Sequence, residues 1–168
     1  MIESIIDNSV LIALIIRSQF KEDGITFFTE SSLSQQLAFM KHPQGKLIQS
    51  HIHQLHMRYV EYTQEVLVIR HGRLRVDLYA ANKSYIGSKI LEPGDVILLA
   101  AGGHGFEVLE DLEMFEIKQG PFVGIEDKVR FEGVTHDQVR LIQQEESRNV
   151  TNCTAQQKCI SNHASAGE

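Results

Sequence analysis

The central part of the chain, residues 25–118, is a series of short apolar runs separated by turn residues. Within residues 73–79, leucine and valine alternate with charged side chains and tyrosine ends the run, which is the period-two pattern of a strand with one buried face. Short strands at regular intervals, with turn signals between them, are typical of an all-β sandwich or barrel. The predicted strands are residues 25–29, 36–40, 46–53, 66–69, 73–79, 96–100, 106–110 and 113–118.

Glycine-containing turns and a weak helical pattern suggest how the rest is organised. His71 and Gly72 stand between two predicted strands and indicate a hairpin turn, whereas residues 82–87 resemble a loop. Val139, Leu141 and Ile142 have helical spacing. The first residues are compatible with a helix or a strand. The sequence therefore predicts an N-terminal segment that packs on or pairs with the barrel, the barrel, a short helix and a disordered tail at residues 1–24, 25–134, 135–146 and 147–168.

Charge and cysteine content limit the partners that we expect. The chain has 168 residues, a formal net charge of −6 and a pI of about 5.7. This length favours one domain, and the acidity argues against binding to nucleic acid or to an anionic membrane. The seven-residue apolar run at 10–16 is too short to span a bilayer. Cys153 and Cys159 form neither a CxxC pair nor a disulfide framework, so we expect a cytoplasmic protein.

Three histidines and one glutamate carry the chemistry that the sequence suggests. His51 and His53 are two residues apart, so a strand would direct both imidazoles to one face. Glu65 begins an apolar run, and an inward-facing carboxylate there requires a cation. His104 lies in a glycine-rich stretch that allows close approach of the backbone. Three imidazoles and a carboxylate suit iron, manganese, zinc, nickel or copper better than calcium or magnesium.

The spacing of these residues resembles the first motif of the cupin superfamily. That motif has a glycine, five residues, H-x-H, a gap, a glutamate, six residues and a glycine. Here Gly45 is followed after five residues by His51 and His53, and Glu65 is followed after six residues by Gly72. The gap, residues 54–64, is longer than is usual in the family. The resemblance covers roughly residues 25–120.

A second cupin motif is matched in part. Gly94-Asp95 and Gly102-Gly103-His104 correspond to it, but Ala100 replaces its proline and Val108 its asparagine. The resemblance implies a double-stranded β-helix, or jelly-roll barrel, with a minor helical C-terminal segment, and such proteins are often homodimers. It also implies one divalent transition metal ion, iron, manganese, zinc or nickel, inside one mouth of the barrel. The implied metal ligands are His51, His53, Glu65 and His104.

Three functions remain open at this stage. The chain is a metal-dependent enzyme of the isomerase or dioxygenase type, acting on a small metabolite such as a sugar or oxo-acid derivative, or it is a non-catalytic module that binds a small ligand or sugar. A metal-free cupin is the third alternative. Candidates for supporting roles are Gln64 beside Glu65, Tyr62 and Arg58 in the long loop, and His56 as a substitute ligand. Lys118, Lys128 and Arg130 are interpreted as surface charges in preference to groups at a pocket mouth.

Overall fold

The computed structural model describes residues 1–121 and 123–143, and the regular secondary structure of this part of the chain is β-strand apart from two short 3-10 turns. Predictions for residues 144–168, including both cysteines, lie outside the described residues. Within the described part of the chain, no helical segment has the length and hydrophobicity that a membrane-spanning helix requires. The strands are β1 (Ile2–Asp7), β2 (Val10–Ile16), β3 (Gly24–Phe27), β4 (Ala38–Lys41), β5 (Glu65–Tyr79), β6 (Tyr85–Leu91), β7 (Val96–Leu99) and β8 (Gly103–Lys118).

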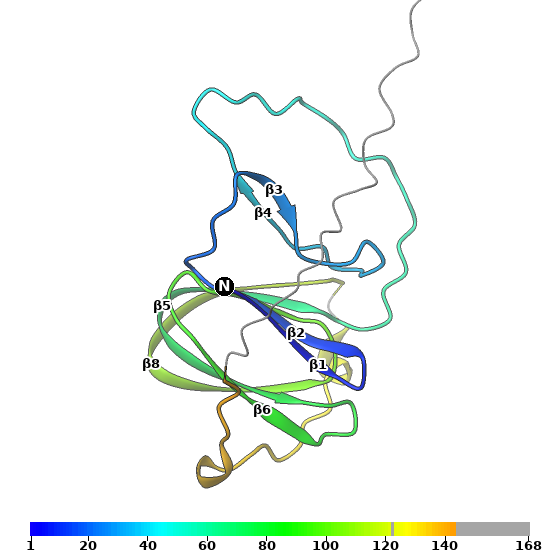
Figure 1. Ribbon diagram of the computed structural model, residues 1–168. Coiled ribbons are helices and arrows are strands. Elements are labelled where there is room, and N and C mark those ends of the chain that lie inside the picture. The colour runs from blue at the N-terminus through cyan, green and yellow to red at the C-terminus, as the bar shows by residue number, and fades with distance from the viewer. Residues whose placement is uncertain (122, 144–168) are drawn as a thin grey trace, which may run out of the picture.

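Six of these strands form one antiparallel sheet that curls into a half-barrel (Figure 1). Their order is β1-β2-β7-β5-β6, and β8 pairs with the other edge of β5. Strands β3 and β4 form a separate hairpin against this sheet. The all-β prediction is therefore confirmed at the level of fold class, and the N-terminal segment, left open between helix and strand, is a β-hairpin that extends the sheet.

Strand β5 organises the half-barrel because it pairs with three other strands. Its first residues pair with β7, its last residues pair with β6, and β8 follows it from end to end. The predicted hairpin at His71 and Gly72 is therefore wrong, since both flanking runs belong to one strand. The runs at 106–110 and 113–118 likewise join into β8. Turn residues inside a long ladder instead produce register shifts, between Ile69 and Leu74 on β5.

Gly72 is the residue that permits this irregularity. Its φ is +79°, in the left-handed region, and a Cβ at this position would overlap the backbone carbonyl of Asp111 on β8. Gly72→Ala is therefore expected to lower the free energy of unfolding by more than about 2 kcal/mol, combining backbone strain with a clash. Urea denaturation measures it. Gly24→Ala is the matched control, because Gly24 has φ +94° and open space around it; equal losses in both variants would contradict the clash.

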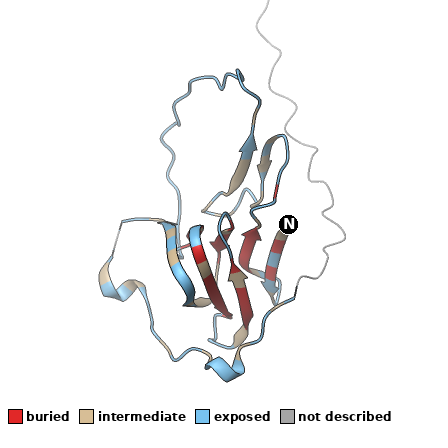
Figure 2. Ribbon diagram, turned by 90° about the vertical axis from the view of Figure 1, so that its left-hand side faces the viewer, coloured by how far each residue is buried: buried red, intermediate tan, exposed pale blue. Residues whose placement is uncertain are grey.

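Two hydrophobic clusters stabilise the sheet from its two faces. The inner cluster fills the curl, and Leu67, Ile69, Leu74, Val76 and Leu78 of β5 contribute to it at no more than 1% exposure. The outer cluster lies between the sheet and the β3–β4 hairpin, where Phe20 packs edge-on against Phe28 and Phe39. Figure 2 shows buried residues concentrated in the central strands. The half-barrel is thus a sheet with a packed inside and a partly covered outside.

Several local predictions are corrected by the structure. Residues 46–53, predicted as a strand, have no regular secondary structure, and they belong to a long loop whose residues 43–63 are all exposed (Figure 2). Residues 85–91, mostly missed, form β6. The predicted strands at 25–29 and 36–40 are confirmed as β3 and β4 with shifted ends. A segment forms a strand only where a neighbouring strand offers backbone hydrogen bonds. The alternation of apolar residues in the sequence does not show whether such a neighbour is present.

The predicted helix at 135–146 is wrong for its described residues. One 3-10 turn, η2 (His136–Gln138), follows the turn η1 (Gly124–Asp127). Beyond η2 the chain runs extended beside β6, where the backbone N–H of Ser88 donates to Arg140 at 2.8 Å and that of Ile142 donates to Ser88 at 2.9 Å. The Ile142 side chain packs on the inner cluster. The apolar residues that suggested a helix therefore belong to an extended segment beside β6.

Candidate metal centre

Glu65, the first residue of β5, points into the curled sheet. It shares a strand face with Leu67 and Ile69, both in the inner cluster, and is only 4% exposed. Such a carboxylate requires compensation, as the sequence predicts. The structure supplies it from two sides: Nε2 of His104 lies 3.1 Å from Glu65 Oε2, and the ammonium of Lys128 lies 3.3 Å from Glu65 Oε1.

The contact between Glu65 and His104 depends on the curl of the β5–β8 ladder. Glu65 pairs with Lys118 at one end of the ladder, and His104 pairs with Leu78 at the other end. In a straight strand these ends would be roughly 40 Å apart, at about 3.3 Å per residue. The register shifts in the middle of the ladder bend it, so that both ends meet at one mouth of the half-barrel. Tertiary structure therefore brings together two residues that the sequence separates widely.

The His104 ring is itself held in place by a neighbour. It stacks on Phe106 at a centroid distance of 5.1 Å and an interplanar angle of 29°. Both side chains lie on the inner face of β8, because they pair with Leu78 and Val76 of the inner cluster. The imidazole is about one quarter exposed, at 27%, so its ring can be reached from the mouth.

The electrostatic environment keeps Glu65 ionised. The hydrogen bond from His104 is the largest influence, and together with the charges of His104 and Lys128 it lowers the pKa of Glu65 to about 2, although burial acts in the opposite direction. An ionised carboxylate is the form that binds a cation. Glu65 is therefore an anionic donor throughout the neutral range.

His51 and His53, the other two predicted ligands, lie in the exposed loop. Their rings are 5.2 Å apart, so the pair remains together, and Nδ1 of His51 is 3.0 Å from the backbone carbonyl oxygen of Gln49. Among residues 1–121 and 123–143, no three His, Cys, Asp or Glu side chains are grouped closely enough to hold a metal ion. The structure thus presents the predicted ligands as two pairs, one at the mouth and one on the loop.

Gln64, expected to support Glu65, is used elsewhere. Its side chain donates to the carbonyl oxygen of Ala100 at 3.0 Å and accepts from Ser34 Oγ and Gln35 N at 3.1 and 3.0 Å. Adjacent strand residues face opposite ways, so Gln64 secures the 34–35 turn on the outer side. The other expected helpers, Tyr62 and Arg58, are exposed in the loop.

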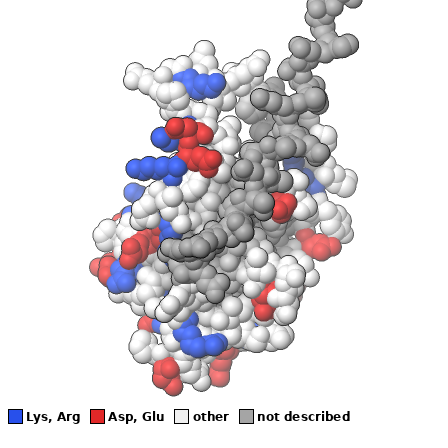
Figure 3. All heavy atoms as spheres, viewed as in Figure 1, with Lys and Arg blue, Asp and Glu red and all other residues white. Residues whose placement is uncertain are grey.

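Two lysines are the functional candidates that the sequence interpretation undervalued. Lys128 contacts Glu65, and Lys118 faces it across the ladder, with its ammonium 3.2 Å from Glu116. A cation near a buried acid is foreseeable once that acid is placed inside, but the sequence does not show which lysine approaches. On the face in Figure 3, lysine and arginine side chains lie among acidic ones.

Comparisons of the chain with protein-family models, with curated proteins and with solved structures found no match.

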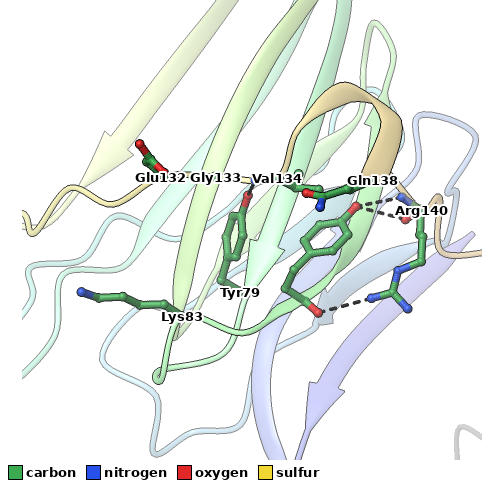
Figure 4. A pocket seen from close by; sticks show the side chains of 8 residues that line it. Tyr79, Lys83, Glu132, Gly133, Val134, Gln138 and Arg140 are labelled. Carbon is green, nitrogen blue, oxygen red and sulfur yellow. Dashed lines mark hydrogen bonds between the residues drawn. The ribbon is translucent and has the colours of Figure 1, made fainter.

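A concavity of about 420 Å³ lies between the end of β5, the start of β6 and the C-terminal segment (Figure 4). Two tyrosines line it, and both hydroxyls are occupied. Tyr79 accepts from the backbone of Val134 at 2.8 Å, and Tyr85 is bonded to Ser88 Oγ at 2.6 Å and to the backbone N–H of Arg140 at 3.0 Å. These bonds hold the C-terminal segment to the sheet. The concavity therefore marks the contact between these two parts of the chain.

Proposed function

We propose that the chain is a metal-dependent cupin that binds a small metabolite at the open mouth of its half-barrel. The observation that carries this proposal is the buried carboxylate of Glu65 with the His104 imidazole 3.1 Å away. A carboxylate and an imidazole converging at one accessible point are borderline donors suited to a first-row transition metal. They fit the metal as half of a site, and the other half is the histidine pair on the loop.

Docking of residues 46–53 would complete the site. Within the described residues β8 pairs only with β5, so its second edge presents unpaired backbone groups, which favour addition of a strand. The loop meanwhile exposes large apolar side chains, with Leu47 and Ile52 each at 89%. Pairing of this segment with β8 would bury apolar surface, close the sheet toward a jelly-roll barrel and carry His51 and His53 to the mouth.

The bound ion would supply Lewis-acid chemistry or a chelation point for two substrate oxygens. Four protein ligands leave two positions on a six-coordinate ion. A sugar or oxo-acid derivative has adjacent oxygens that suit them, and we propose an isomerase- or dioxygenase-type reaction on such a metabolite. The same arrangement serves a non-catalytic sugar-binding module, so turnover of a sugar and oxo-acid panel by metal-loaded protein separates the two.

The decisive experiment measures metal binding and loop protection together. Purified full-length protein is expected to bind about one equivalent of Mn²⁺, Ni²⁺ or Zn²⁺ by calorimetric titration, because four ligands of the predicted set define one site. Hydrogen exchange at residues 46–53 is expected to slow when metal is added, because docking forms strand hydrogen bonds.

The matched control for this experiment is His71→Ala, set against His104→Ala. Both histidines lie on strands of the same ladder, but His71 is exposed, and its Nδ1 is 3.0 Å from the backbone carbonyl oxygen of Asp111. Loss of metal binding is expected for His104→Ala alone. Absence of binding in the unaltered protein, even after reconstitution, would overturn the proposal.

A further inference from the structure

The concavity between β5, β6 and the C-terminal segment is lined by two cationic side chains. Its volume is about 420 Å³, and Lys83 and Arg140 lie on opposite sides of the tyrosine pair that lines it (Figure 4). Within residues 1–121 and 123–143, neither cation has a carboxylate oxygen within 4.0 Å. The three arginines of β5, by contrast, each have an acidic partner. The concavity therefore carries positive charge that these parts of the chain do not neutralise by direct ion pairing.

Aromatic rings hold these two cations in place of carboxylates. The ammonium of Lys83 lies 5.7 Å from the ring centroid of Phe131, and Cζ of Arg140 lies 5.3 Å from that of Tyr85. The main chain of Arg140 is also fixed, because its N–H donates to the Tyr85 hydroxyl at 3.0 Å. A ring face attracts a cation without carrying a net charge, so both positive charges remain available to a bound anion.

The backbone conformation of Lys83 is costly for a lysine. Its φ is +71°, in the left-handed region that glycine adopts readily and residues with a Cβ rarely adopt. The turn imposes this conformation: the backbone N–H of Lys83 donates to the carbonyl oxygen of Ala80 at 2.9 Å, and that of Ser84 donates to Asn82 Oδ1 at 3.0 Å. Glycine would relieve the strain, so stability alone does not account for a lysine at this position.

We propose that this concavity binds an elongated small molecule with a carboxylate or phosphate group at each end, one group at Lys83 and the other at Arg140. Ammonium and guanidinium groups donate charge-assisted hydrogen bonds to such oxygens. Glu132 also lines the concavity and opposes anion binding, so the ligand must engage both cations. The site needs no metal and shares no residue with the centre at Glu65 and His104.

The test titrates full-length protein with acetate and with straight-chain dicarboxylates from succinate to adipate, in metal-free buffer of low ionic strength, and follows backbone amide NMR shifts. The best dicarboxylate is expected to bind at least about threefold more tightly than acetate, which engages one cation. Lys83→Gly and Arg140→Gln are each expected to weaken its binding about two- to fivefold, the effect of one exposed ion pair. Glu132→Gln is expected to tighten it about twofold.

Asn8→Gly is the matched control, because Asn8 also has a positive φ, +47°, but lies in the turn between β1 and β2. Both glycine variants are expected to unfold at an equal or higher urea concentration than the unaltered protein, and only Lys83→Gly is expected to lose dicarboxylate affinity. The inference is overturned if no dicarboxylate binds better than acetate, or if Lys83→Gly binds like Asn8→Gly. A lower urea midpoint for Lys83→Gly would also overturn it, because the lysine would then serve stability.

Discussion

Replacing His53 with alanine is expected to lower the affinity for a divalent transition metal by at least about 100-fold. Removal of a group that merely orients a metal ligand already costs about 10–100-fold, and loss of a ligand costs more. Because the His53 side chain is exposed, the variant is expected to unfold at the same urea concentration as the unaltered protein when no metal is added. Metal titration and denaturation together separate a ligand from a structural residue.

His56→Ala is the control that tests the geometry of the loop. His56 lies in the same exposed segment, three residues beyond His53, and it would face away from His51 and His53 if the segment paired as a strand. Its replacement is expected to leave metal affinity within about threefold of the unaltered value. If His56→Ala loses metal and His53→Ala retains it, the ligand set is wrong even though a metal site exists.

A buried ion network at the start of the sheet gives the largest expected effect on stability. Arg17, just after β2, donates to Glu3 at 2.5 Å, to Asp95 at 2.8 Å and to the carbonyl oxygen of Ile90 at 2.8 Å. Lys89 approaches Glu3 from β6. The two carboxylates are 7% and 2% exposed, so the guanidinium joins four segments of chain through buried charges.

Arg17→Met is therefore expected to lower the free energy of unfolding by about 3 kcal/mol. Removing one partner leaves buried carboxylates less well compensated, which costs about 3–5 kcal/mol in comparable cases. We expect the lower end, because Asp95 retains the backbone N–H groups of Ser18 and Glu92 as donors. Urea denaturation monitored by circular dichroism measures the change in midpoint.

Arg70→Met provides the comparison for a surface pair. Arg70 lies 4.0 Å from Glu113, and both side chains are more than half exposed, at 58% and 66%. Its replacement is expected to cost less than about 1 kcal/mol. If the two variants lost equal free energy of unfolding, burial of the Arg17 ion network would not explain its contribution to stability.

The strands were predictable where alternation is regular, and their connections were not. The pattern of residues 73–79 indicates an extended segment, and the structure confirms it as the end of β5. The turn at Gly72 was predicted as a hairpin because a glycine between two apolar runs usually reverses the chain. Here β8 supplies hydrogen bonds on both sides of Gly72, so the same glycine bends one long ladder.

For the candidate site, the residue types could be predicted from the sequence. Of the four predicted ligands, the structure brings Glu65 and His104 into contact. The sequence requires that an inward-facing Glu65 have a cationic or hydrogen-bonded partner, and His104 is that partner. Lys128 was not foreseen in this role. Periodicity does not report that Gln119 and Asp127 lie against the start of β5, where Asp127 Oδ1 accepts from Thr63 Oγ1 and Gln119 Oε1 accepts from the backbone N–H of Gln64.

Alternation of apolar residues and turn residues act over a few positions of the chain. The sequence alone was therefore enough to establish the all-β class, and to indicate that an inward-facing Glu65 carboxylate needs a charged or hydrogen-bonding partner. Curvature is a property of the whole ladder, accumulated from strand twist and from register shifts between distant residues. Only the tertiary structure could therefore decide that the two ends of β5 and β8 meet at one mouth, with Glu65, His104 and Lys128 in contact there.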